Sequence, residues 1–158
     1  MTVPRPEALW VLLLLAPIPA RGLDPLGAET CKACHPAAYE IWKESAHARA
    51  LAALPERSRG DARCTVCHAP EGQKGQGGVT CESCHGNGQL YARRYVMRDR
   101  ELARALGLQD VGEKSCLRCH DESTPSLGKW DHARKLPLIQ HGEAEREARR
   151  AAAAAGRP

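Results

Sequence analysis

The 158-residue sequence contains no phenylalanine, only 3 tryptophans and 3 tyrosines, and 27% charged residues. Side chains of this composition make a thin core, so one domain of this length must bury something besides its own side chains. The formal net charge of +4 does not indicate nucleic-acid binding, because no basic arm with interleaved aromatic residues accompanies it.

The N-terminus predicts an export signal. Arg5 precedes an apolar run over residues 9–16, which is followed by two prolines and Ala20. The run is too short to cross a bilayer but suits the core of a signal peptide, with Ala20 before the cleavage point. We therefore expect residues 1–20 to be a signal peptide and the protein to be periplasmic or otherwise exported, in a bacterium. It would have no membrane span after cleavage, and an uncleaved anchor is the alternative.

One pattern, Cys-x-x-Cys-His, occurs four times along the chain and contains every cysteine. The cysteines are Cys31, Cys34, Cys64, Cys67, Cys81, Cys84, Cys116 and Cys119, and the histidines that follow the pairs are His35, His68, His85 and His120. The pattern is typical of c-type heme attachment, in which two thiols form thioethers with the porphyrin and the histidine becomes the proximal iron ligand. Zinc sites and disulfide scaffolds also use paired cysteines, but neither needs a histidine after each pair.

Four covalently attached heme c groups would supply the apolar surface that the composition lacks. We therefore expect residues 21–142 to form one tetraheme cytochrome c domain. It should be mainly α with long loops and little or no sheet, its fold organised by packed hemes. The heme propionates would bring the net charge of the holoprotein to about −4.

Residues 36–54, after the first motif, predict one helix that begins with Pro36 and is stopped by Pro55. His47 would then lie about 18 Å along the helix from His35. We therefore expect His47 to reach a heme other than the first.

Three further segments complete the chain. Residues 69–80 are dense in glycine, which lets a backbone approach a flat cofactor closely, and Glu71 within them should be solvated. Residues 98–106 predict a helix ended by Gly107. Residues 143–158 form a charged, alanine-rich C-terminal tail, expected to be a solvated helix or a frayed end.

Candidates for the distal iron positions are fewer than the hemes. Beyond the four motif histidines the sequence has His47, His132 and His141. Met97 is the other strong candidate, and its thioether would raise the reduction potential of its heme. Ordinary packing is the alternative for this methionine.

Three segments carry a resemblance: WKESAHARA at 42–50, GVTCESCHG at 78–86 and IQHG at 139–142. Together they resemble the small tetraheme cytochromes of the cytochrome c-554 family, typified by the electron acceptor of hydroxylamine oxidoreductase. The resemblance implies that His47 and His141 are distal ligands, with His141 serving the fourth heme, and that the heme on His68 is five-coordinate. The family places another histidine shortly after the third motif, whereas this chain has Met97 there, with His132 as the rival ligand of the first heme.

These features predict an electron carrier whose partners are other redox proteins, either cytochromes or a periplasmic or membrane oxidoreductase. The alternative is a small redox enzyme that reduces a nitrogen or oxygen species, such as nitric oxide, at an open heme on His68. The carrier is favoured because Glu71 is the one evident general acid near that motif, and a lone glutamate in a glycine-rich loop is usually solvated.

Overall fold

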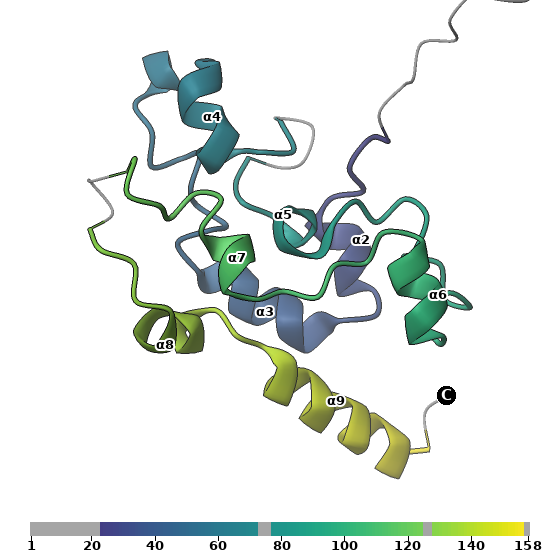
Figure 1. Ribbon diagram of the computed structural model, residues 1–158. Helices are drawn as coiled ribbons and strands as arrows, with labels where there is room; N and C mark the ends of the chain where they lie inside the picture. The colour runs from purple at the N-terminus through teal and green to yellow at the C-terminus, as the bar shows by residue number, and fades with distance from the viewer. Residues whose placement is uncertain (1–22, 73–76, 125–127, 157–158) are drawn as a thin grey trace, which may run out of the picture.

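The computed structural model describes residues 23–72, 77–124 and 128–156, and in these ranges the chain consists of helices and loops without a strand (Figure 1). The predicted signal peptide lies outside the described residues. The helices are α2 (Ala28–Lys32), α3 (Pro36–Glu44), α4 (Ala62–His68), α5 (Cys81–His85), α6 (Arg100–Ala105), α7 (Glu113–Cys116), α8 (His132–Lys135) and α9 (Gly142–Ala154). Two 3-10 turns, η1 (Glu56–Ser58) and η4 (Leu136–Leu138), join them. The expectation of a mainly α fold with long loops is therefore confirmed.

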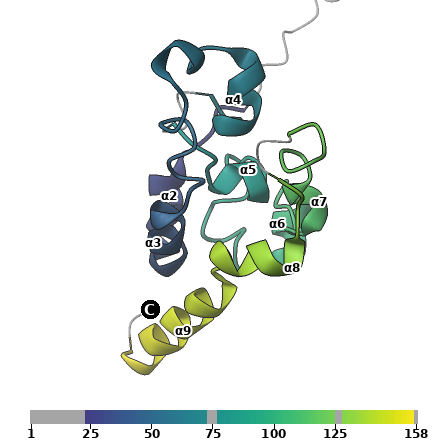
Figure 2. The same cartoon turned by 90° about the vertical axis from the view of Figure 1, so that its left-hand side faces the viewer.

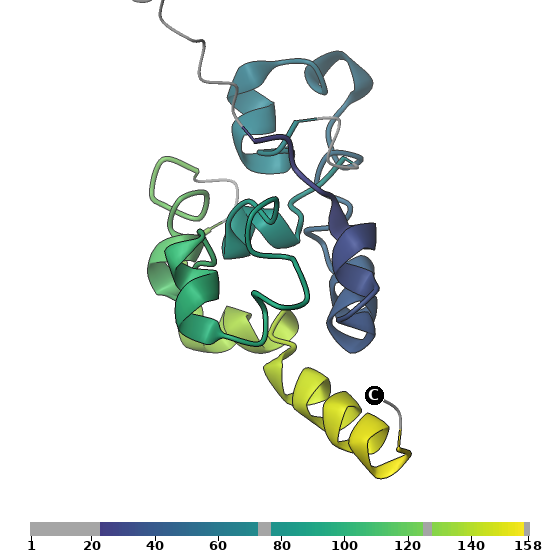
Figure 3. The same ribbon diagram turned by 90° about the vertical axis from the view of Figure 1, so that its right-hand side faces the viewer.

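The helices spread along one direction, with α4 at one end and α9 at the other in all three views (Figures 1, 2 and 3). Between these ends α2 contacts both α3 and α5. In the described ranges, no helix has the length and apolar character needed to cross a membrane.

The side-chain core is as thin as the composition predicts. One small cluster joins Tyr91, Val96 and Ala103, and among the described residues Val96 is the one large side chain that is fully buried. The predicted helix at 98–106 is present as α6, which Asp99 caps through the backbone N–H groups of its first turn. Since so few apolar side chains are buried, packing among side chains alone holds little of this fold together.

The helix after the first motif ends ten residues earlier than predicted. α3 stops at Glu44, Ser45 is extended with φ −75° and ψ 162°, and residues 46–53 run through successive turns. Two contacts to Val79 explain the departure, because its carbonyl accepts from Trp42 Nε1 at 2.8 Å and its N–H donates to the carbonyl of His47 at 3.0 Å. His47 therefore lies in a turn and not on a helix, so the distance argument based on one long helix was wrong.

The C-terminal segment is a helix that lies against α3, not a free end. Most residues of α9 are exposed, as expected, but Glu145 is directed into the contact and accepts a hydrogen bond from the backbone N–H of Ala38 at 3.2 Å. α9 is thus joined to the first turn of the helix that follows the first motif.

Candidate heme-binding sites

Each Cys-x-x-Cys-His motif forms one turn of helix. The second motif is the last part of α4 and the third is the whole of α5. In the first and fourth motifs the histidine N–H donates to the carbonyl of the first cysteine, at 2.9 Å in both. Residues three and four apart lie on one face of a helical turn, so the two thiols and the imidazole of each motif share one side.

Two pairs of histidine rings lie close together, at a separation that would admit a metal between them. The ring centroids of His47 and His120 are 6.0 Å apart, and those of His85 and His141 are 5.9 Å apart. Two imidazoles on opposite sides of one metal stand about 6 Å apart, since a metal–nitrogen bond is about 2.0 Å and each ring centre lies about 1.1 Å behind its nitrogen. Both separations therefore fit a pair of axial iron ligands.

These pairs change one expectation. His141 lies opposite His85 of the third motif and His47 lies opposite His120, whereas the resemblance assigns His141 to the fourth heme, so this placement favours the third motif for His141. The physical reason is the course of the chain after α8, where η4 and Ile139 carry it into the pocket of the third motif.

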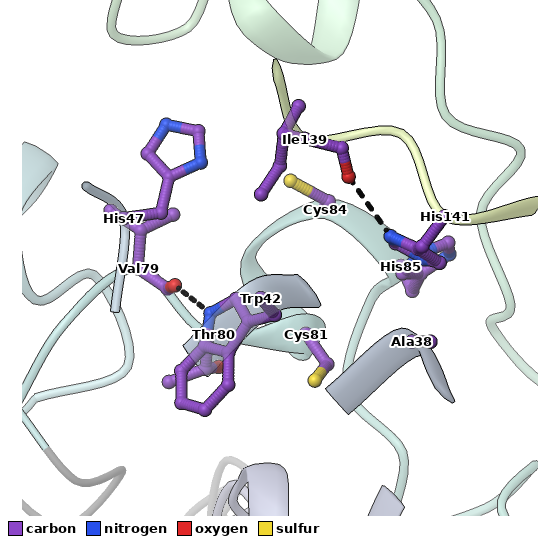
Figure 4. A pocket seen from close by; sticks show the side chains of 10 residues that line it. All are labelled: Ala38, Trp42, His47, Val79, Thr80, Cys81, Cys84, His85, Ile139 and His141. Carbon is purple, nitrogen blue, oxygen red and sulfur yellow. Dashed lines mark hydrogen bonds between the residues drawn. The ribbon is translucent and has the colours of Figure 1, made fainter. Parts of the chain in front are cut away.

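That pocket is shown in Figure 4. Its walls include both thiols of the third motif together with His85 and His141, and Trp42 and His47 complete another side. Thiols that can form thioethers and imidazoles that can bind iron therefore line one pocket, as a covalently held heme would require. In the described ranges, by contrast, no three His, Cys, Asp or Glu side chains gather into a cluster suited to zinc.

Burial favours the neutral form of three of these histidines. It lowers the pKa of His47, with a further contribution from His120, and it lowers the pKa of His85, next to His141. It also lowers the pKa of His120, with help from the charge of Lys135. Because imidazole binds iron in its neutral form, these environments favour ligation.

Hydrogen bonds orient three of the imidazoles. Nδ1 of His68 lies 2.7 Å from the carbonyl oxygen of Ala50, and Nδ1 of His141 lies 3.1 Å from that of Ile139 (Figure 4). A carbonyl can only accept, so Nδ1 carries the proton and Nε2 is left free for a metal. His35 is held differently, by the carboxylate of Glu145 at 2.9 Å.

Proximity between thiols gives the spatial order of the motifs. A hydrogen bond with Cys81 lowers the pKa of Cys31, and the same contact raises the pKa of Cys81. Burial and then the nearby Cys116 raise the pKa of Cys84. Burial, followed by contact with Cys67, raises the pKa of Cys119 to about 11. The first motif therefore adjoins the third, the third adjoins the fourth, and the fourth adjoins the second.

The segments 42–50 and 78–86 are packed on each other. A Cβ atom at Gly78 would lie 2.6 Å from the carbonyl oxygen of Ala48 and 2.7 Å from that of His47. Glycine is therefore needed at position 78 because two backbone segments approach closely. The sequence had suggested a different reason, the approach of the backbone to a flat cofactor. The contact fixes the turn that presents His47.

Glu71 was expected to be solvated, but its carboxylate is held by hydrogen bonds. Its carboxylate accepts from Ser83 Oγ at 2.7 Å and from Thr80 Oγ1 at 3.1 Å, and these hydroxyls belong to the N-terminal turn of α5. The side chain is half-buried and supports the third motif. Its role in the structure is to hold this turn.

The remaining two candidate ligands lie in different places. Met97 is partly buried and packs against the cluster of Tyr91, Val96 and Ala103. His132 lies beside the fourth motif, with Nδ1 4.0 Å from Sγ of Cys116. Met97 therefore occupies the packing position that was its alternative, and His132 lies beside a motif whose histidine is already opposite His47.

Sequence reasoning missed three residues of the sites. Glu82 is buried and its carboxylate accepts from the N–H groups of Gly27 at 2.9 Å and Gly88 at 2.8 Å.

Trp130 is the second of these residues. Its ring lies on that of His120 with centroids 4.5 Å apart, and its buried indole N–H has no acceptor in the described chain. A buried indole N–H normally finds an acceptor, and a heme propionate would provide one. Glu145 is the third, and its partner lies 110 positions earlier in the sequence.

Comparisons with known proteins agree with this chemistry. The family model described as cytochrome c554 and c-prime matches residues 30–86. Among curated proteins, cytochrome c-554 of Nitrosomonas europaea is 32% identical in an alignment 157 positions long, gaps included, that covers 75% of this chain and 67% of that protein. No solved structure matches the chain.

Proposed function

We propose that this chain, which belongs to the cytochrome c-554 family, is a periplasmic tetraheme cytochrome that passes electrons between redox partners. Membership of the family makes the chain a c-type cytochrome, which binds heme covalently and carries electrons. The number of hemes, their ligands and the location belong to the proposal.

The cysteines of the four motifs would hold the hemes as thioethers, and the motif histidines would be the proximal ligands. His47 would be the distal ligand at the fourth motif and His141 at the third, with Met97 the candidate at the first. When bound, the hemes supply one-electron chemistry, while the protein sets ligands, spacing and dielectric.

The observation that carries the proposal is the two pairs of neighbouring imidazole rings, with ring centroids 6.0 Å and 5.9 Å apart. Each pair joins a motif histidine to a histidine from a distant segment. Side chains spaced in this way fit axial ligation on both sides of one iron, which leaves no free position for a substrate. Such sites suit electron transfer.

The structure also weakens the enzymatic alternative. Glu71 was the acid that the sequence offered near the second motif, but its carboxylate is held by Ser83 and Thr80 of the third. A general acid must reach the reacting group, and a carboxylate held by two hydroxyls elsewhere is poorly placed for this. The electron carrier is therefore the function that the geometry supports best.

The first test is the mass of the exported protein, produced together with the cytochrome c maturation machinery. We expect a chain cut after Ala20 that carries four hemes and no zinc. A variant with Cys64 and Cys67 replaced by alanine is the matched control and should lose one heme. Three or fewer hemes in the parent protein would contradict the proposal.

The second test separates a carrier from an enzyme. The fully reduced protein is mixed anaerobically, in stopped flow, with nitric oxide, hydroxylamine, nitrite or peroxide, and separately with an oxidised cytochrome. We expect fast exchange with the cytochrome and slow or single-turnover oxidation by the small molecules. Rapid multiple turnover with any of them, abolished by a tight ligand at the His68 heme, would overturn the carrier assignment.

A further inference from the structure

Glu145 of α9 bridges two groups of the first motif region. One carboxylate oxygen, Oε1, lies 2.9 Å from Nδ1 of His35, and the other accepts from the backbone N–H of Ala38 at 3.2 Å. The side chain is only 13% exposed, although it belongs to a helix of mostly charged and solvated residues. The carboxylate is therefore fixed at both oxygens and aimed at the imidazole.

Arg149, one turn further along α9, completes the group. Its Nε is 3.6 Å from Oε1 of Glu145, and a terminal nitrogen is 3.4 Å from Nδ1 of His35. With Nε2 bound to iron, a neutral imidazole carries its proton on Nδ1, so Nδ1 must donate and cannot accept from arginine. The hydrogen bond therefore runs from His35 to Glu145, and Arg149 pairs with the carboxylate.

The first and second motifs differ in the group that accepts the Nδ1 proton of the motif histidine. Nδ1 of His68 donates to a neutral carbonyl, that of Ala50. An ionised acceptor makes a stronger hydrogen bond than a neutral one, and a histidine that donates to a carboxylate becomes a more basic metal ligand. A more basic imidazole favours ferric over ferrous iron, which lowers the reduction potential.

We propose that Glu145 is a positioning residue that lowers the reduction potential at the first motif by accepting the Nδ1–H of His35. The inference rests on the proposed attachment of heme at that motif. Among the described residues, His35 is the one motif histidine whose Nδ1 meets a carboxylate, and its motif lies at one end of the spatial order first, third, fourth, second. Arg149 opposes the effect, since its charge withdraws density from the carboxylate.

The test is a heme-resolved redox titration, followed by NMR of the heme methyl groups, on the full holoprotein. In Glu145→Gln we expect one of the four potentials to rise. A tenfold change in the ratio of oxidised to reduced iron corresponds to about 59 mV for one electron, and we expect a shift of that order. The Nδ1 proton of the same heme ligand should also exchange faster with solvent.

Three variants make the result specific. Glu147→Gln removes the same charge from an exposed position of the same helix and should shift no single potential in this way. Glu145→Asp keeps an ionised acceptor and should restore part of the low potential. Arg149→Gln leaves the carboxylate in place and should lower the same potential, which decides the question if Glu145→Gln fails to mature.

Intact mass, which counts the attached hemes, distinguishes failure of the proposed function from failure of the inference about Glu145. If the parent protein lacks heme at the first motif, the proposed function itself is wrong. If Glu145→Gln carries four hemes and its potentials move no more than those of Glu147→Gln, or if Arg149→Gln lowers no single potential, the role of Glu145 is refuted.

Discussion

Gly78→Ala should disconnect His47 from the site that it faces. The added Cβ would lie 2.6 Å and 2.7 Å from two carbonyl oxygens of segment 47–48. Nonbonded contacts between heavy atoms are most favourable at about 3.5 Å, so the two backbones must separate by several tenths of an ångström. Both clashing atoms are backbone, so no side chain can rotate away to relieve them.

The magnitude follows from two contributions. Overpacking at a close contact costs about 1–3 kcal/mol. The hydrogen bond from Val79 N–H to the His47 carbonyl, at 3.0 Å, spans the same contact, and its loss costs about 0.5–1.5 kcal/mol. In a domain of this size, a loss of 1 kcal/mol in the free energy of unfolding lowers Tm by about 4 °C. The two contributions together therefore predict a decrease in Tm of about 6–18 °C.

The assay combines thermal unfolding with the spin state of the bound irons. In Gly78→Ala one heme should change from low to high spin in the optical and EPR spectra, because His47 moves away from His120. Gly60→Ala is the matched control, since a Cβ there meets nothing within 4 Å and no positive φ is involved. Unchanged spectra and an unchanged Tm in Gly78→Ala would refute the argument that the close backbone contact positions His47.

Three further changes test other parts of the sites. His47→Ala and His141→Ala should each convert one heme to high spin, the first at the fourth motif and the second at the third; if both variants alter the same heme by EPR, the pairing is wrong. Met97→Leu should abolish the near-infrared absorption band of methionine bound to ferric iron, and a parent protein without this band would leave Met97 a packing role only. Glu82→Gln should lower the free energy of unfolding by about 1–3 kcal/mol, because an amide nitrogen then faces one of two buried N–H donors. Denaturant unfolding measures this loss, and an effect no larger than that of exposed Glu122→Gln would count against it.

The heme-binding chemistry could be predicted from sequence because it is local. The spacing within each Cys-x-x-Cys-His motif is satisfied by one helical turn, and no distant contact is needed to bring its three side chains to one face. The thin core also follows directly from composition, since a chain without phenylalanine has few large apolar side chains to bury.

The errors arose where tertiary contacts override local preference. Residues 36–54 have the pattern of one helix, but the bonds of Trp42 and His47 to Val79 end it at Glu44. The pairing of His141 with His85 depends on the course of the chain through η4, which no local pattern encodes. Glu145 was also missed, because a glutamate in a charged helix gives no sign of a partner on another helix.

Positioning of the two proposed distal histidines follows one principle in this chain. His47 is held by a backbone contact with the segment that leads into the third motif, yet it faces the histidine of the fourth. His141 comes from beyond the fourth motif and faces the histidine of the third. Each histidine pair therefore joins segments that the helical turns alone would leave separate. Because the side-chain core is small, these long-range pairs should supply much of the stability, and folding should depend on heme attachment in the same way that small metal domains depend on their metal.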